Sequence, residues 1–160
     1  MKKIIVIFMF LLLTGHVVTF AQSGASEIIS KDNVSIDKIK SIFENSFYEI
    51  RETAATYILF KDIFTIYADL DKDNRYITLS VNWPIKESFS MEERFKLLNT
   101  ISKEVLVVTP YYNAEGTSLI VKTTIWIEGG STARNIVYTE KIFVKALNLI
   151  LDKDVLGIIK

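Results

Sequence analysis

Residues 75–83 read Arg-Tyr-Ile-Thr-Leu-Ser-Val-Asn-Trp, and apolar and polar side chains alternate along this stretch. One side of it carries Ile77, Leu79, Val81 and Trp83, and the other carries Tyr76, Thr78, Ser80 and Asn82. A period of two is typical of a β-strand that lays one face on a hydrophobic core. The stretch therefore predicts a sheet with one covered face.

Further strands are expected on both sides of this central one. Residues 57–60 and 63–69 are rich in β-branched and aromatic types, which favour strands. The short polar side chains of residues 71–74 suit the turn into the central strand, and Pro84 ends it. Residues 105–112 and 117–128 then predict a hairpin.

Three helices are predicted from apolar spacings of three and four. They cover residues 35–47, about 90–104 and about 132–151. Ser90 and Glu93 form a capping-box pattern at the start of the second helix. Its buried stripe is expected to hold Met91, Phe95, Leu97, Leu98 and Ile101. The sequence thus predicts an α+β fold in the order α-β-β-β-α-β-β-α, with an antiparallel sheet of about five strands and helices packed on it.

The N-terminal segment, 1–21, has the pattern of a secretory signal peptide. Lys2 and Lys3 precede an uninterrupted apolar run, and small residues stand before Gln22. An uncleaved membrane anchor is the alternative, but a spanning helix needs roughly 20 apolar residues. The ending Phe20-Ala21-Gln22 resembles signals common in the Bacteroidetes. We expect a cleaved signal at 1–21, a flexible lead-in at 22–34 and a single domain at 35–160. The mature protein would be periplasmic or secreted, with no stable membrane insertion.

Composition excludes several classes of chemistry. The 160 residues include no cysteine, and the single histidine, His16, lies within the expected signal. The mature chain would therefore lack thiolate and Ser–His nucleophiles. Removal of Lys2 and Lys3 leaves 17 basic against 19 acidic residues, a net charge of about −2. Such a charge gives no electrostatic footprint for nucleic acid.

Local motifs favour structural roles over catalytic or metal-binding ones. Residues 69–74, Asp-Leu-Asp-Lys-Asp-Asn, resemble the start of a calcium loop, but Asn74 and Ser80 stand where that loop needs Gly and Glu. A hairpin turn is the favoured interpretation. Gly129-Gly130-Ser131-Thr132 fits an ordinary loop into a helix cap better than an anion site. No catalytic residue, metal site or cofactor is predicted, and an enzyme is not expected.

A family resemblance adds to this pattern. The element order, the segment Ser-Met-Glu-Glu-Arg-Phe-Lys-Leu-Leu-Asn at 90–99, the hairpin after it and the Gly129-Gly130 loop resemble the YbjN-like and type III secretion chaperone-like group. The resemblance covers about residues 35–151. It implies an α+β fold with an antiparallel sheet of about five strands. It also implies a protein-binding, often dimeric and non-catalytic role.

Aromatic residues supply the candidate binding surface. Tyr76, Tyr111, Tyr112 and Trp126 fall on edge positions or opposite the apolar face, where ordinary partly exposed packing, a partner surface and a small apolar groove are the alternatives. We therefore expect an exported, non-catalytic protein-binding domain, chaperone-like or regulatory, whose partner is another protein or a second copy. The alternative is a small apolar-ligand carrier with a pocket between sheet and helices, lined by Phe64, Trp83 and Trp126.

Overall fold

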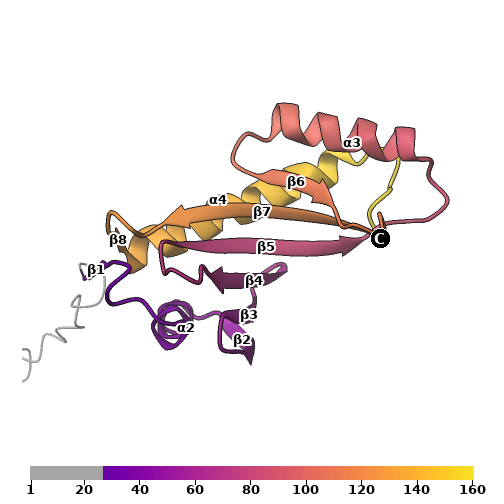
Figure 1. The fold of residues 1–160 in the computed structure, drawn as a ribbon. Coiled ribbons are helices and arrows are strands. Elements are labelled where there is room, and N and C mark those ends of the chain that lie inside the picture. The colour runs from indigo at the N-terminus through magenta and orange to yellow at the C-terminus, as the bar shows by residue number, and fades with distance from the viewer. Residues whose placement is uncertain (1–26) are drawn as a thin grey trace, which may run out of the picture.

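The structure, a computed structural model, describes residues 27–160, and its centre is a six-stranded antiparallel sheet (Figure 1). The strand order is β2-β3-β4-β5-β7-β6, so β2 and β6 form the edges. The longest pair, β5 and β7, is joined along nine residues of each strand. The strands are β2 (Glu49–Thr53), β3 (Tyr57–Lys61), β4 (Thr65–Leu70), β5 (Tyr76–Pro84), β6 (Thr109–Tyr112) and β7 (Ser118–Trp126).

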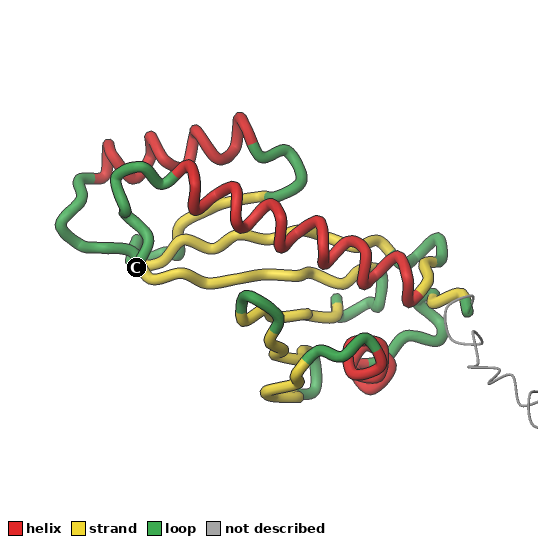
Figure 2. The backbone as a smooth tube through the Cα atoms, turned by 180° about the vertical axis from the view of Figure 1, so that it is seen from behind, coloured by secondary structure: helices red, strands yellow, loops and turns green. Residues whose placement is uncertain are grey.

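Helices pack against one face of this sheet. The helices are α2 (Ile36–Asn45), α3 (Met91–Glu104) and α4 (Ala133–Lys153). α4 runs along β5 and β7, behind them in Figure 1 and in front of them in Figure 2. α2 places Phe43 on Phe60 of β3, with ring centroids 4.2 Å apart. α3 lies over β6, where the Tyr112 hydroxyl donates a hydrogen bond of 2.7 Å to the Arg94 carbonyl. The predicted antiparallel α+β architecture is confirmed.

The alternation in β5 has the predicted consequence for burial. Ile77 and Leu79 are 0% exposed and Val81 is 2% exposed, and all three belong to the core beneath the helices. Side chains also cap the starts of these helices. Ser35 accepts from the Lys38 amide at 3.1 Å, and Ser90 and Glu93 form both bonds of the capping box. The alternation within β5, the burial of its apolar side chains and the caps at the helix starts are therefore all consistent with the same fold.

The strand count differs from the expected five because three strands lack a usable hydrophobic pattern. β2 is an edge strand, and Ile50 is the only apolar residue in its sequence Glu-Ile-Arg-Glu-Thr. β1 (Ile28–Ile29) and β8 (Ser131–Thr132) pair with each other as a separate sheet of only two residues per strand. Periodicity cannot identify strands of that length.

β1 also changes the expected start of the domain. Residues 22–34 were predicted as a flexible lead-in, yet Ile29 is 1% exposed and Val34 7% exposed, and both belong to the core. Gly130 makes the β1–β8 pairing possible, since its φ is +91° and a Cβ there would lie 2.9 Å from the Ile28 side chain. The domain therefore includes residues before Ser35. The predicted signal peptide, 1–21, lies outside the described residues.

The expected buried stripe of α3 is partly wrong. Leu97 and Ile101 are buried, but Met91 is 51% and Phe95 50% exposed. α3 packs over the β6 edge and not over the middle of the sheet, so only a narrow side of the helix meets the core. Within residues 27–160, no helix combines the length and the apolar character required to cross a membrane.

Candidate partner-binding face

The face of the sheet opposite the helices is open. None of its outward-pointing side chains on β3, β4, β5, β6 and β7 is buried. We call this surface the open face and define it by Tyr57, Leu59, Tyr67, Asp69, Tyr76, Thr78, Ser80, Asn82, Tyr111, Ile120, Lys122, Thr124 and Trp126. Because side chains alternate along each strand, the buried residues of the same strands all point to the helices.

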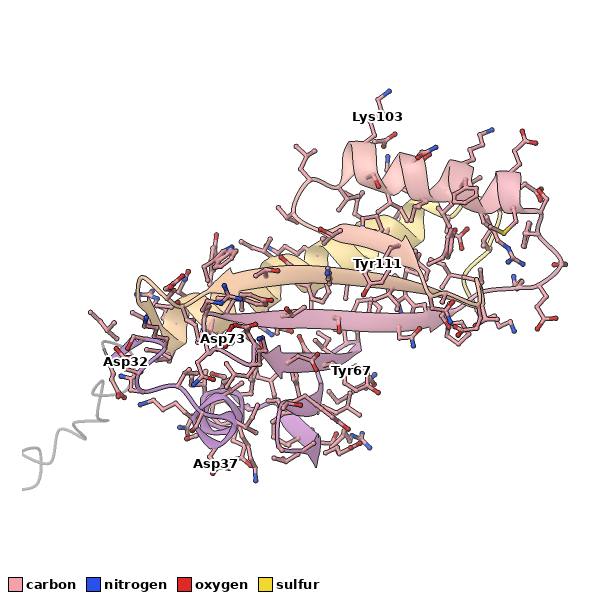
Figure 3. The ribbon with its side chains drawn as sticks, viewed as in Figure 1. Asp32, Asp37, Tyr67, Asp73, Lys103 and Tyr111 are labelled. Carbon is pink, nitrogen blue, oxygen red and sulfur yellow. The ribbon has the colours of Figure 1, made fainter. Side chains whose placement is uncertain are left out.

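The strand register arranges the aromatic residues of the open face in two clusters. Tyr76 of β5 stands opposite Trp126 of β7, and their rings meet at 5.2 Å and 64°. The Tyr57 and Tyr67 rings of β3 and β4 lie 5.7 Å apart. Lys122 places its ammonium 5.3 Å from the centre of the Tyr111 ring. Figure 3 labels Tyr67 and Tyr111 on this face.

The predicted surface residues divide between the two faces. Tyr76, Tyr111 and Trp126 lie on the open face, and Trp126 is 63% exposed. Tyr112 lies beneath α3, where its ring stands 6.4 Å from that of Phe95. The other two predicted residues, Phe64 and Trp83, form an edge-to-face pair at 5.7 Å and pack against the core.

The ligand-carrier interpretation required Phe64, Trp83 and Trp126 to line one pocket. Trp126 lies on the open face, whereas Trp83 lies on the covered face opposite Leu119, so the three do not converge. Between the sheet and α4, Phe143 and Leu147 fill the core at 1% and 0% exposure. A groove of about 340 Å³ lies elsewhere, between α3 and the C-terminal part of the chain from the last residue of α4 to Ile158.

Asp69 is a functional candidate that the sequence interpretation did not select. Its carboxylate lies on the open face of β4, directly opposite Tyr57 on one side and Thr78 on the other. Burial raises the pKa of this carboxyl. Within residues 27–160, its side chain makes neither a hydrogen bond nor a salt bridge. The sequence does show that Tyr57 and Leu59 share one side of β3 and that Tyr67 and Asp69 share one side of β4. It does not show that these two sides belong to the same face of the sheet, because that depends on the strand register.

The acidic turn after β4 has the structural role that was favoured for it. Asp71 Oδ2 accepts hydrogen bonds from the Asp73 amide at 3.2 Å and from Arg75 Nε at 3.1 Å. Hydrogen bonds from Arg75 and Asp73 lower the pKa of the Asp71 carboxyl although partial desolvation opposes them. Among the described residues, no group of three or more His, Cys, Asp or Glu is arranged to hold a metal ion.

A second polar cluster lies inside the protein. Glu140 of α4 is 0% exposed; its Oε2 accepts from the Tyr48 hydroxyl, and its Oε1 has no hydrogen-bond partner. Lys141 Nζ lies 3.7 Å from the same Oε2, 3.0 Å from Asp62 Oδ2 and 4.6 Å from the Tyr48 ring centre. Burial raises the pKa of both Tyr48 and Glu140. This cluster joins α4 to the segment between α2 and β2 and to the β3–β4 turn.

Burial of Glu140 also determines how stability changes with pH. Desolvation raises the pKa of its carboxyl, and Tyr48 and Lys141 only partly oppose this. The folded protein therefore keeps a proton that the unfolded chain releases. The stability from this group is complete below the ordinary glutamate pKa and is lost as pH rises through the raised pKa. Glu140→Gln stays neutral, so it should match the parent in acid and be more stable than the parent above that window. Urea unfolding of both proteins across pH would check this, and parallel pH profiles would contradict it.

An antiparallel sheet with helices packed on one face places this chain among α+β domains, and its arrangement is that of the YbjN-like fold. The structure is similar to the crystal structure of YbjN from E. coli, with a TM-score of 0.67, 12% identity, and coverage of 82% of this chain and 98% of that one. It is also similar to an uncharacterized protein from Methanothermobacter thermautotrophicus, with a TM-score of 0.53, 15% identity, and coverage of 75% and 99%. No family model and no curated protein sequence matches the chain. The expected YbjN-like fold is confirmed.

Proposed function

We propose that this protein is an exported, non-catalytic binding domain that holds a protein partner on the open face of its sheet. The observation that carries this proposal is the group of aromatic residues on the open face, among them the exposed Tyr67, Tyr111 and Trp126, on a surface that no helix covers. Trp and Tyr are enriched at protein interfaces because they offer large, rigid contact areas with one polar end. An exposed patch of this kind marks an interaction site on a globular domain.

The polar residues of the open face support a protein partner over an apolar ligand. Thr78, Ser80, Asn82 and Thr124 share the open face with the aromatic clusters and offer hydroxyl and amide groups. Aromatic anchors mixed with Ser, Thr and Asn are typical of surfaces that bind proteins through wet, adaptable contacts. A carrier of small apolar ligands would instead need an enclosed, largely apolar cavity.

Replacement of Trp126 by alanine is expected to weaken partner binding about 30-fold or more, the effect of losing about 2 kcal/mol at a hot spot. A photo-crosslinking amino acid at Thr124 would capture the partner from an envelope extract, and the dissociation constant would then be measured with the purified partner. If the captured chain is the protein itself, sedimentation would give the dimer constant.

Tyr138 provides the matched control for this measurement. It is an aromatic residue of α4 with 64% exposure, against 63% for Trp126, and it lies on the helical side of the molecule. Tyr138→Ala is expected to leave the affinity within twofold. A partner whose affinity depends on Tyr138 and not on Trp126 would contradict the proposal.

The export part of the proposal rests on the segment 1–21 alone. When the full chain is expressed in a bacterium with a general secretion system, we expect the exported product to begin at Gln22. The measured mass of the exported product should equal that of the chain without residues 1–21, and N-terminal sequencing would identify the cleavage site. A product that keeps Met1 and stays with the inner membrane would favour the uncleaved anchor.

A further inference from the structure

We propose that the open face recognises a cationic side chain, an arginine or lysine of the partner, at a site made by Asp69 with the rings of Tyr57 and Tyr67. This inference rests on the proposed function and names the chemistry of the partner. Its basis is an acidic side chain that, among the described residues, has no hydrogen bond or salt bridge and stands beside aromatic residues on the open face.

The register defines the geometry of this cation site. Tyr57 is the direct cross-strand neighbour of Asp69, and Tyr67 precedes Asp69 by two positions on the same face of β4. Side chains in direct cross-strand positions have Cβ atoms about 5 Å apart. The two rings lie 5.7 Å apart with an angle of 60° between their planes, and the register places both residues next to Asp69 on the open face. Thr78, on the other side, offers a hydroxyl.

Basic residues on and around this face have partners within residues 27–160. Lys61, on the same face of β3 as Tyr57, donates to the Ile63 carbonyl at 2.9 Å. Lys122 lies over the Tyr111 ring at 5.3 Å, on the far side of β5. Arg75 is bound by Asp71 at 3.1 Å and by Asp73 at 3.6 Å. Among the described residues, Asp69 therefore faces the partner side without a neutralising charge. The charge of an approaching cation would favour the ionised carboxylate of Asp69 and so oppose the effect of burial, which raises the pKa of this carboxyl.

Two properties of the site select a cation over other ligands. The faces of tyrosine rings carry negative potential and attract ammonium and guanidinium groups within about 6 Å. A carboxylate adds a charge-assisted hydrogen bond, and guanidinium can make two at once. The Tyr57 hydroxyl already donates to Glu52, which places a second carboxylate at the rim of the site. An anionic ligand would meet two acidic groups there and would be repelled.

The direct test uses N-acetyl-arginine amide as the probe and N-acetyl-glutamine amide as its neutral counterpart. In amide NMR spectra, the arginine compound should shift residues 57, 67–70 and 78 at millimolar concentration, and the glutamine compound should not. Asp69→Asn should lower the affinity for the arginine compound at least tenfold. Asp152→Asn removes one charge from the exposed end of α4 and should change its affinity less than twofold. Equal binding by Asp69→Asn, or shifts confined to other acidic residues, would overturn the inference.

The captured partner separates this inference from the proposed function. The cation site is supported if Trp126→Ala and Asp69→Asn both weaken binding of the partner. In addition, Asp69→Asn should no longer affect the binding of a partner variant that lacks its contacting arginine or lysine. If only Trp126→Ala weakens the partner, the cation site is wrong while the proposed function stands. If neither change weakens it, both are overturned. Thermal melts of the two variants verify that the fold is retained.

Discussion

Replacement of Phe60 by alanine is expected to lower the free energy of unfolding by about 3–5 kcal/mol. Phe60 is 0% exposed on β3; its ring stacks on Phe43 of α2 at 4.2 Å and meets the edge of Tyr48 at 5.3 Å. Alanine would remove the contact that fixes α2 to the sheet and leave a cavity between two rings. Since domains of this size are stable by about 5–15 kcal/mol, the loss is a large share of the total.

Phe47 is the matched control for Phe60. It is 98% exposed with a φ of +66°, and alanine would share any strain of that backbone conformation. Phe47→Ala is therefore expected to change stability by less than about 0.5 kcal/mol. Equilibrium urea unfolding of both variants and the parent, followed by circular dichroism, would measure the difference. Similar midpoints for the two variants would show that the α2–β3 contact does not stabilise the fold.

Replacement of Tyr48 by phenylalanine is expected to lower the free energy of unfolding by about 1–3 kcal/mol near neutral pH. The Tyr48 hydroxyl donates to Glu140, whose other carboxyl oxygen has no partner. Without that hydroxyl, the buried carboxyl group of Glu140 keeps only the ammonium of Lys141, 3.7 Å away. Urea unfolding would measure the cost. An unfolding free energy equal to that of the parent would show that water or a rearranged side chain replaces the hydroxyl.

The central part of the fold could be predicted because its patterns are local and long. β5 alternates over its full length, and α4 keeps an apolar stripe over 21 residues. The capping box of α3 is visible within the four positions from Ser90 to Glu93. β2 could not be predicted, because it is an edge strand in which only Ile50 packs against the core. Its sequence therefore has no apolar alternation that would mark it as a strand.

The candidate site could be predicted only in part, because its assembly depends on register. Tyr76 and Trp126 are distant in the chain, and only the pairing of β5 with β7 makes them neighbours. Asp69 becomes part of the candidate site only because the pairing of β3 with β4 places Tyr57 next to it. Glu140 did leave a signal. It lies four positions after Ile136 and three before Phe143, so the apolar spacing of α4 itself places a carboxylate in the core.

Both edge strands of the sheet have features that hinder pairing with a strand of another molecule. β2 carries Glu49, Arg51 and Glu52 and is interrupted by a register shift between Ile50 and Glu52, while β6 contains Pro110, which has no amide hydrogen to offer. Charges, bulges and proline are the features that stop one sheet from templating strands of another chain. The protein can therefore expose aromatic side chains across a whole sheet face while its backbone edges resist growth into fibrils.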